Sequence, residues 1–291
     1  MSVLEAFLQG VLQGLTEFLP VSSSGHLSLF QYFTGNSGDT GFLFSILLHA
    51  GTLIAVFIVF RRTIADLILE AFSLLRDLFT GRFSAKNMSP SRRMLLFLLL
   101  SLLPLTVMFL IKDWVEGFST DNDVTVEGFC FLLTGVMLLT ACKHDHGRKN
   151  ASSMKAKDAV AVGVAQVVAT MPGISRSGST ISAGMLWGFE REYAVTYSFI
   201  LGIPAVLGAI IFEVPDAFRE GSGLPLPVIL TGFLTSAVFG VLAIKLVQWV
   251  VKGNKLKYFG WYTLALGAVM LTVGVIDNLA GHPIQQFFIG K

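Results

Sequence analysis

A short segment near the N-terminus combines side chains that can bind or attack an anion. The carboxylate of Glu17, the hydroxyls of Ser22 to Ser24 and the imidazole of His26 lie within ten consecutive positions. Pro20 ends any helix that arrives from the N-terminus, and the serines after it can cap a new helix, whose first N–H groups lack partners. Gly25 lets the backbone approach a ligand closely. The segment therefore predicts an anion-binding turn in front of a helix.

Ser23 and His26 are three positions apart, so they share one face if both lie in the first turn of the helix after Pro20. A hydroxyl is a poor nucleophile until a base takes its proton. An imidazole can take that proton near neutral pH. We therefore expect Ser23 and His26 to act as nucleophile and base, while Ser22 and Ser24 have the alternative role of helix caps.

The chain contains this pattern twice, in copies that lie 153 positions apart, as Ser22 and Ser175 do. Three separate matches share the offset: Gly10-Val11-x-Gln13 with Gly163-Val164-x-Gln166, Ser22-x-Ser24-Gly25 with Ser175-x-Ser177-Gly178, and Phe44-Ser45 with Tyr197-Ser198. They predict an internal duplication with about half of the chain in each unit. Ser23 falls opposite Arg176, so one copy carries a nucleophile-like centre and the other a cationic centre.

The composition is that of a membrane protein. Hydrophobic residues make up 53% of the 291 residues, charged residues make up 14%, and the mean hydropathy is +0.70. A soluble domain carries about 25% charged residues. Six apolar segments approach the roughly 20 residues that a membrane span needs. They are 42–60, 94–111, 126–142, 193–212, 226–251 and 259–277. Residues 64–72 have the pattern of an amphipathic helix at the membrane surface.

Two further apolar regions are broken by proline into halves that are too short to span, namely 3–19 with 22–34 around Pro20, and 158–189 around Pro172. Gln9, Gln13 and Glu17 fall on one helical face, which a lipid-facing helix would not carry. We therefore expect two re-entrant hairpins, which exist at membrane depth only where other protein segments cover them.

Basic and acidic loops alternate along the chain. The basic loops are 61–93, 143–157 and 252–258, and the acidic loops are 112–125 and 213–225. The positive-inside rule places the basic loops in the cytoplasm and both termini outside. The first hairpin then enters from outside and the second from the cytoplasm.

The fold class that follows is an all-α polytopic membrane protein with six transmembrane helices plus two re-entrant helix hairpins in an inverted-topology repeat. A single integral membrane domain covers 1–291, with repeats at approximately 1–142 and 158–277. Such repeats place their binding sites near the membrane midplane, where broken helices meet. Arg176 would be costly there without an anionic partner, and its guanidinium binds phosphate oxygens through two parallel hydrogen bonds.

Both motifs resemble those of the undecaprenyl-pyrophosphate phosphatases of the bacitracin-resistance type. That family carries Glu/Gln-x-x-x-Glu running into Pro-x-Ser-Ser-x-Gly-His, and later Pro-Gly-x-Ser-Arg-Ser-Gly-x-Thr. Here the motifs read Gln13-Gly14-Leu15-Thr16-Glu17, Pro20 to His26, and Pro172 to Thr180. The resemblance covers both motifs, their order and spacing, and the membrane pattern of nearly the whole chain. The first position of the first motif is the neutral Gln13.

The resemblance implies an enzyme of the bacterial inner membrane. It hydrolyses undecaprenyl pyrophosphate to undecaprenyl phosphate and inorganic phosphate, which recycles the lipid carrier for peptidoglycan and other cell-wall synthesis and confers bacitracin resistance. We expect Ser23 to attack the terminal phosphorus, His26 to act as base and Arg176 to stabilise the transferring oxygens. Glu17 is implied to bind a divalent cation, Mg²⁺ or Ca²⁺, or to orient the diphosphate. The expected substrate-binding residues are Gln13, Thr16, Ser22, Ser24, Gly25, Gly173, Ser175, Ser177, Gly178 and Thr180.

Several alternatives stay open. His26 is the nucleophile in a second assignment, through a phosphohistidine, with Ser23 positioning the phosphate. A transporter or flippase of a phosphorylated polyprenyl lipid is the main alternative function, since it needs an anion site but no serine and histidine pair. His49, inside a span, is either a buried histidine bonded to a neighbouring helix or a functional one. The expected partners are a polyprenyl diphosphate lipid and the bilayer, without nucleic acid. A homodimer is possible. The active site is expected on the extracytoplasmic side.

Overall fold

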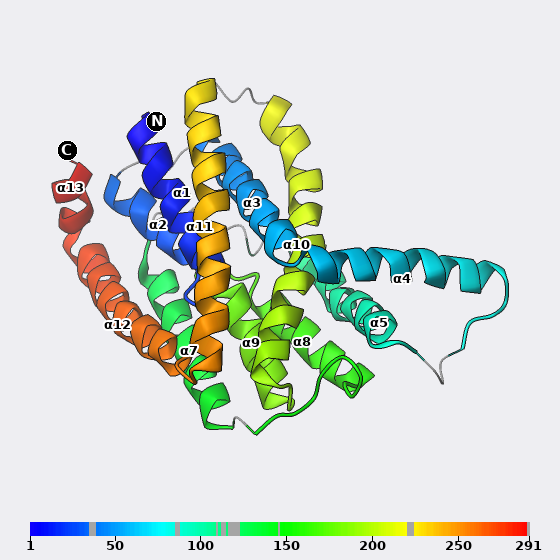
Figure 1. Cartoon of the computed structure of the whole chain (residues 1–291). Coiled ribbons are helices and arrows are strands. Elements are labelled where there is room, and N and C mark those ends of the chain that lie inside the picture. Colours follow the sequence, from blue (N-terminus) through cyan, green and yellow to red (C-terminus); the bar gives the residue numbers. More distant parts are fainter. Residues whose placement is uncertain are drawn as a thin grey trace.

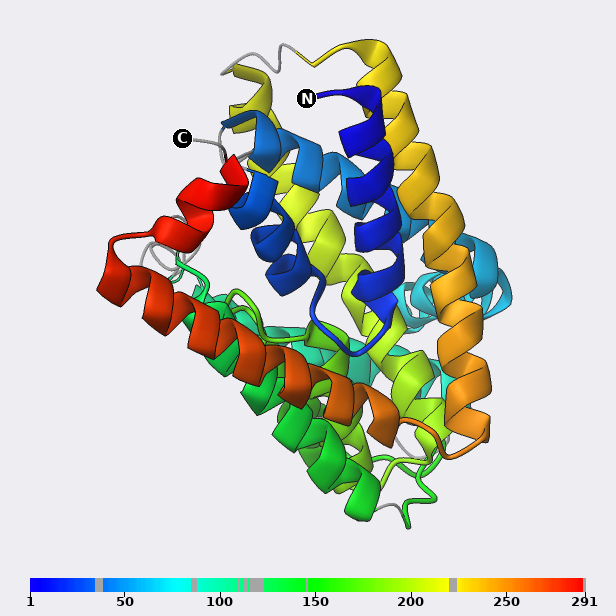
Figure 2. The same cartoon turned by 90° about the vertical axis from the view of Figure 1, so that its left-hand side faces the viewer.

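The computed structural model describes residues 1–34, 39–84, 88–108, 110–111, 115, 123–144, 146–219 and 224–289. Regular structure in these residues is helical, apart from one isolated bridge between Lys149 and Phe189. In chain order the elements are α1 (Val3–Phe18), α2 (Ser23–Thr34), α3 (Asp39–Val59), α4 (Arg61–Phe79), α5 (Pro90–Leu102), the 3-10 helix η1 (Leu103–Val107), α7 (Thr125–Lys143), α8 (Ala156–Val168), α9 (Arg176–Leu186), α10 (Arg191–Arg219), α11 (Leu226–Lys252), α12 (Lys257–Ala280) and α13 (Pro283–Ile289). The N-terminus and α13 lie at the same end of the molecule (Figure 1, Figure 2).

Within the described residues, four helical segments are long and apolar enough to cross a membrane. They are α5 with η1, α7, α11 and α12, which are the predicted segments 94–111, 126–142, 226–251 and 259–277. A fifth is formed if α3 and α4 count as one broken span, although these two helices are bent by 87°. The chain is therefore a helical, multi-pass membrane protein.

Proline interrupts both apolar regions for which the sequence predicts a break. α1 ends before Pro20 and α2 begins after it, and Pro172 lies in the same way between α8 and α9. Figure 2 shows that the turn between α1 and α2 lies in the middle of the molecule and not at one end. Other helices therefore surround the turn, as a polar break in a membrane protein requires.

The two breaks share one capping hydrogen bond. The Gly25 N–H donates to Ser22 Oγ at 3.2 Å, and the Gly178 N–H donates to Ser175 Oγ at 3.0 Å. Each bond satisfies one of the first N–H groups of a helix. The predicted capping role is confirmed for Ser22 and for its counterpart Ser175, whereas Ser24 accepts a hydrogen bond from Gly173 of the other turn.

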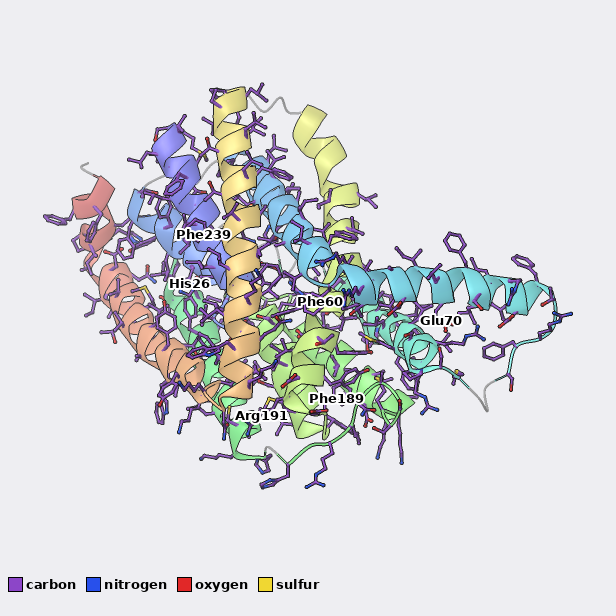
Figure 3. The ribbon with its side chains drawn as sticks, viewed as in Figure 1. His26, Phe60, Glu70, Phe189, Arg191 and Phe239 are labelled. Atoms are coloured by element: carbon purple, nitrogen blue, oxygen red, sulfur yellow. The ribbon has the colours of Figure 1, made fainter. Side chains whose placement is uncertain are left out.

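α4 leaves the bundle sideways (Figure 1). The predicted amphipathic segment 64–72 lies within this longer helix, and Phe72 is exposed on its outer side. The polar side is held by Arg92 at the start of α5, whose guanidinium donates to Glu70 at 2.9 Å and to Asp77 at 2.8 Å. Figure 3 marks Glu70 on this projecting part.

The helices that begin the two hairpins pack across the halves of the chain. α1 lies along α11, and α8 lies along α5 and η1. Small residues let the backbones of α1 and α11 approach closely. A Cβ on Gly14 would lie 2.7 Å from the Ser236 carbonyl oxygen, and one on Gly10 would lie 2.9 Å from that of Gly232. This close packing fixes the position of the last turn of α1 along α11.

An aromatic cluster joins the two halves next to the first hairpin. The Phe199 ring of α10 packs edge-on against Phe18 of α1, with 5.3 Å between ring centroids. It also packs against Phe60, between α3 and α4, at 6.1 Å (Figure 3). All three rings are buried in the main hydrophobic core, so this packing holds α1, α3 and α10 together around the residues that follow.

Candidate active site

The tips of the two hairpins touch each other. The Gly173 N–H donates to Ser24 Oγ at 3.3 Å, and Ser177 Oγ donates to the Leu19 carbonyl oxygen at 3.3 Å. A Cβ on Gly25 would lie 3.2 Å from the Gly173 Cα, so this approach depends on glycine. The two copies of the motif therefore form one site.

Glu17, which is 7% exposed, lies at the centre of this contact. Its Oε1 accepts a hydrogen bond from Arg176 Nη2 at 2.5 Å across the two hairpins. Its Oε2 accepts from Ser23 Oγ at 2.6 Å and from Gln13 Nε2 at 3.0 Å. A buried carboxylate is costly unless it is paired and hydrogen-bonded. The hydroxyl expected to be nucleophilic and the expected cation are thus bridged by one carboxylate.

Arg176 reaches Glu17 from a slot beside α10. A Cβ on Gly202 would lie 2.0 Å from Arg176 Nη1 and 2.8 Å from its Cζ, so any larger residue would displace the guanidinium. Nη1 is buried and has no hydrogen-bond partner among the described residues. The guanidinium therefore keeps a donor that a ligand oxygen can satisfy after a small movement.

His49 of α3 also faces this cluster. Its Nδ1 lies 2.8 Å from the Ser45 carbonyl oxygen of the same helix, and its Nε2 lies 3.6 Å from Glu17 Oε2. The side chain is 31% exposed. His49 is therefore bonded to its own helix and its Nε2 lies near Glu17, and a functional role stays a prediction. The sequence feature that could have pointed to His49 is the match of Phe44-Ser45 with Tyr197-Ser198, which extends the repeated pattern into α3.

The structure does not bring Ser23 and His26 together, as the expected nucleophile and base would require. His26 Nδ1 lies 2.6 Å from the Ser22 carbonyl oxygen, and Nε2 lies 2.8 Å from the Tyr262 hydroxyl. A histidine can turn back onto the carbonyl four residues earlier, and Tyr262 then holds the far side of the ring. His26 accordingly lies on the side of α2 that faces α7 and α12, where its ring also contacts Phe131 (Figure 3).

A cavity of about 410 Å³ opens beside the Glu17 cluster. Its polar wall is formed by Thr16, Glu17, Ser23, Ser24, Ser45, His49, Thr170, Ser175 and Arg176. Its apolar wall is formed by Ile46, Ala169, Met171, Pro172, Ile174, Ala205, Val206 and Ile210. The lining therefore offers polar groups that suit an anion and apolar side chains that suit a hydrocarbon.

The remaining expected binding residues build the turns and do not line the cavity. They are Gln13, Ser22, Gly25, Gly173, Ser177, Gly178 and Thr180. Thr180 is an example: its Oγ1 donates to the Arg176 carbonyl oxygen at 2.8 Å and lies 2.6 Å from Ser198 Oγ. These residues position the backbone from which Ser23 and Arg176 extend.

The donor set around Glu17 does not fit a resident metal ion. In the described residues no group of three or more His, Cys, Asp or Glu side chains could hold one. Mg²⁺ and Ca²⁺ need six or more oxygen ligands, whereas both oxygens of Glu17 already accept hydrogen bonds, and Gln13 presents an N–H to it. Glu17 is therefore not assigned as a metal ligand of the protein.

The fold and the site define a helical membrane protein. Between its two broken-helix hairpins the Glu17 carboxylate binds the Ser23 hydroxyl and the Arg176 guanidinium. The family model described as bacitracin resistance protein BacA matches residues 6–269, and the chain belongs to this family. A relative from Alkaliphilus metalliredigens, named undecaprenyl-diphosphatase, is 39% identical over 278 residues, which cover 95% of this chain and 100% of the relative. Relatives with the same name from Methanosphaera stadtmanae and Treponema denticola are each 37% identical, over 95% and 92% of this chain and 99% and 96% of their own length.

Proposed function

We propose that this chain is an undecaprenyl-diphosphatase, which hydrolyses undecaprenyl diphosphate to undecaprenyl phosphate and inorganic phosphate within the membrane. The observation that carries the proposal is the Glu17 cluster, in which Ser23 and Arg176 meet from opposite hairpins beside a half-apolar cavity. Family membership and the shared name of the relatives support the same reaction. The activity recycles the lipid carrier for cell-wall synthesis, and the family name ties it to bacitracin resistance.

The first chemical step follows from the geometry of Ser23. Its hydroxyl donates to Glu17 Oε2 at 2.6 Å, so the proton has an acceptor in place when Oγ attacks the terminal phosphorus. The bond between phosphorus and Ser23 Oγ forms, the bond to the bridging oxygen breaks, and undecaprenyl phosphate leaves. Glu17 then holds the serine proton. Glu17 replaces His26 as the base in this step.

Arg176 is proposed to stabilise the charge on the transferring phosphate. Its Nη1 donor is buried beside Gly202 without a partner among the described residues, so a small turn of the guanidinium can offer it to a phosphate oxygen. A diphosphate in the cavity competes with Glu17 for the guanidinium. Any transfer of Arg176 towards the phosphate also leaves Glu17 a stronger base for Ser23.

His26 is proposed to position the turn and not to react. Both of its ring nitrogens are occupied, by the Ser22 carbonyl and by Tyr262. A phosphohistidine at His26 would first require one of these contacts to break. The geometry therefore favours Ser23 as nucleophile over the alternative assignment.

The apolar wall is proposed to guide the prenyl chain. Ala205, Val206 and Ile210 of α10 line the cavity, and Leu207 and Ile211 of the same helix are exposed outside it. These apolar side chains of α10, inside and outside the cavity, support a route for the prenyl chain along this helix. A divalent cation, Mg²⁺ or Ca²⁺, is proposed to arrive with the diphosphate oxygens, since the protein supplies one occupied carboxylate there.

The finer topology is also a proposal: six spans and two re-entrant hairpins in inverted repeats at approximately 1–142 and 158–277. The crossed packing of α1 on α11 and of α8 on α5 supports it. The charge of the loops supports termini and an active site on the extracytoplasmic side. A monomer or homodimer, and the absence of a nucleic-acid partner, stay predictions.

Cysteine labelling tests this orientation. In a chain with Cys130 and Cys142 replaced by alanine, an impermeant maleimide on intact cells should label Gln286→Cys but not Arg148→Cys, both of which are exposed positions. Labelling of both positions after the cells are opened is the control. The reverse pattern in intact cells would invert the proposed topology.

The activity itself is tested with the purified full chain in detergent. Undecaprenyl diphosphate should release one inorganic phosphate per molecule, and undecaprenyl phosphate should release none. Glu17→Gln serves as the inactive control. A protein that binds the lipid diphosphate without releasing phosphate would contradict the proposal and favour the transporter.

A further inference from the structure

We propose that His49 is a further catalytic residue, and that its Nε2 takes the proton of the water that cleaves the phosphoserine. The inference rests on the proposed function, because it concerns the second half of that reaction. It starts from the position of His49, whose Nε2 lies 3.6 Å from Glu17 Oε2 on the cavity wall.

The tautomer of His49 is set by its own helix. A carbonyl oxygen only accepts hydrogen bonds, so the nitrogen 2.8 Å from the Ser45 carbonyl, Nδ1, carries the hydrogen. In the neutral ring Nε2 then has the free lone pair. That lone pair is directed towards the Glu17 carboxylate and the cavity, where a water molecule or phosphate would lie.

The proton balance of the second step requires another acceptor. After the first step Glu17 holds the serine proton, and Ser23 Oγ needs that proton back when its bond to phosphorus breaks. Water supplies the new bond to phosphorus and must lose a proton of its own. Glu17 cannot take it while it still holds the first.

His49 is the remaining base among the described residues that line the cavity. The charged or titratable groups that face it are Glu17 from α1 and Arg176 from α9, and a guanidinium does not give up its proton in proteins. His26 lies outside the cavity with both nitrogens occupied. The second step therefore forms the water oxygen to phosphorus bond and breaks the Ser23 oxygen to phosphorus bond. The Glu17 proton goes to Ser23, and the water proton goes to His49.

The internal repeat gives an independent indication that this position belongs to the site. The residue 153 positions after His49 is Gly202, which makes the slot for Arg176. The same position on α3 and on α10 therefore faces the Glu17 and Arg176 pair from two sides. In one copy it carries a base, and in the other it leaves room for the cation.

The test separates the two half-reactions in the full-length protein by rapid quenching with undecaprenyl diphosphate. In His49→Gln we expect the burst of undecaprenyl phosphate to keep its rate within about threefold, while steady-state phosphate release falls about 100-fold or more, the usual contribution of a general base. Phosphate should then accumulate on Ser23. The burst amplitude also counts the folded, active molecules, so poor folding cannot imitate this result.

His144→Gln is the matched control, because His144 Nδ1 lies 2.9 Å from the Thr140 carbonyl oxygen in the same local geometry, in an exposed place. It should leave both phases unchanged. An unchanged steady-state rate in His49→Gln, or equal slowing of both phases, would overturn the inference, since a phosphate oxygen or a purely structural role would then suffice. A wild-type protein that releases no phosphate would instead overturn the proposed function.

Discussion

The two hairpins share a capping hydrogen bond but carry opposite chemistry. In the first copy, α1, α2 and α3 carry Glu17, Ser23 and His49, and all three side chains line the cavity. The matching positions of the second copy are Thr170 in the turn between α8 and α9, Arg176 at the start of α9, and Gly202 in α10. One copy therefore supplies the acceptor, the hydroxyl and the imidazole, whereas the other supplies the cation and the space that the cation needs.

The comparison shows which features the two copies of the motif share and which differ. The capping serines and the glycines after them make equivalent hydrogen bonds in both copies. They set the turn from which the next helix starts. The side chains at three positions then decide the function of each copy.

The largest expected effect comes from the nucleophile of the first copy. Ser23→Ala should lower the turnover number by at least about three orders of magnitude, because the atom that forms the phosphoenzyme is missing. Ser24→Ala is the matched control, since it removes the 3.3 Å bond from the Gly173 N–H and the 3.4 Å bond with Ser22 Oγ but leaves the Ser23 hydroxyl in place. Phosphate release by the two purified variants measures the effect. Equal losses in both would argue against Ser23 as the attacking group.

A smaller effect is expected from the space in the second copy. Gly202→Ala places a methyl group 2.0 Å from Arg176 Nη1, so the flexible guanidinium must move while the helix backbone stays. A shift of about 1 Å in a positioned group costs up to about 100-fold in rate. We expect kcat for diphosphate hydrolysis to fall about 10- to 100-fold, with an unchanged unfolding temperature.

Gly208→Ala on the same helix is the control for Gly202→Ala, because a Cβ there meets nothing within 4 Å. It should keep full activity. If both variants lose activity alike, the general behaviour of α10 is responsible and the slot is not. If neither loses activity, Arg176 does not need its position beside Gly202.

Much of this arrangement could be predicted from the sequence. The proline breaks, the caps and the opposition of Ser23 to Arg176 depend on local rules and on the repeat, both of which are visible in the chain. The direction of His26 could not be predicted, because it depends on Tyr262, which is 236 positions away. The contact of His49 with Glu17 likewise depends on how α3 packs beside α1. Breaks and caps set by neighbouring residues were predictable, and partners from distant helices were not.

The role of Gly202 could not be predicted from the sequence either. A glycine in an apolar helix is ordinary in membrane proteins, and only the position of Arg176 shows what a side chain there would displace. The amphipathic segment 64–72 was predicted correctly in kind but too short. The hydrophobic pattern indicates a helix face, while the ends of α4 depend on its contacts with α5.

The central claim is that both hairpins act on one phosphate, and the single-turnover rate constant of Arg176 variants tests it most directly. Arg176→Ala should be slower by two to three orders of magnitude, or about 3–4 kcal/mol in the activation free energy, since a charge-assisted contact is lost in a water-poor site. Arg176→Lys should recover little, because an ammonium cannot make two parallel hydrogen bonds. Thermal unfolding of each variant controls for misfolding. A near-normal rate constant in folded Arg176→Ala would remove the second hairpin from the reaction and contradict the account.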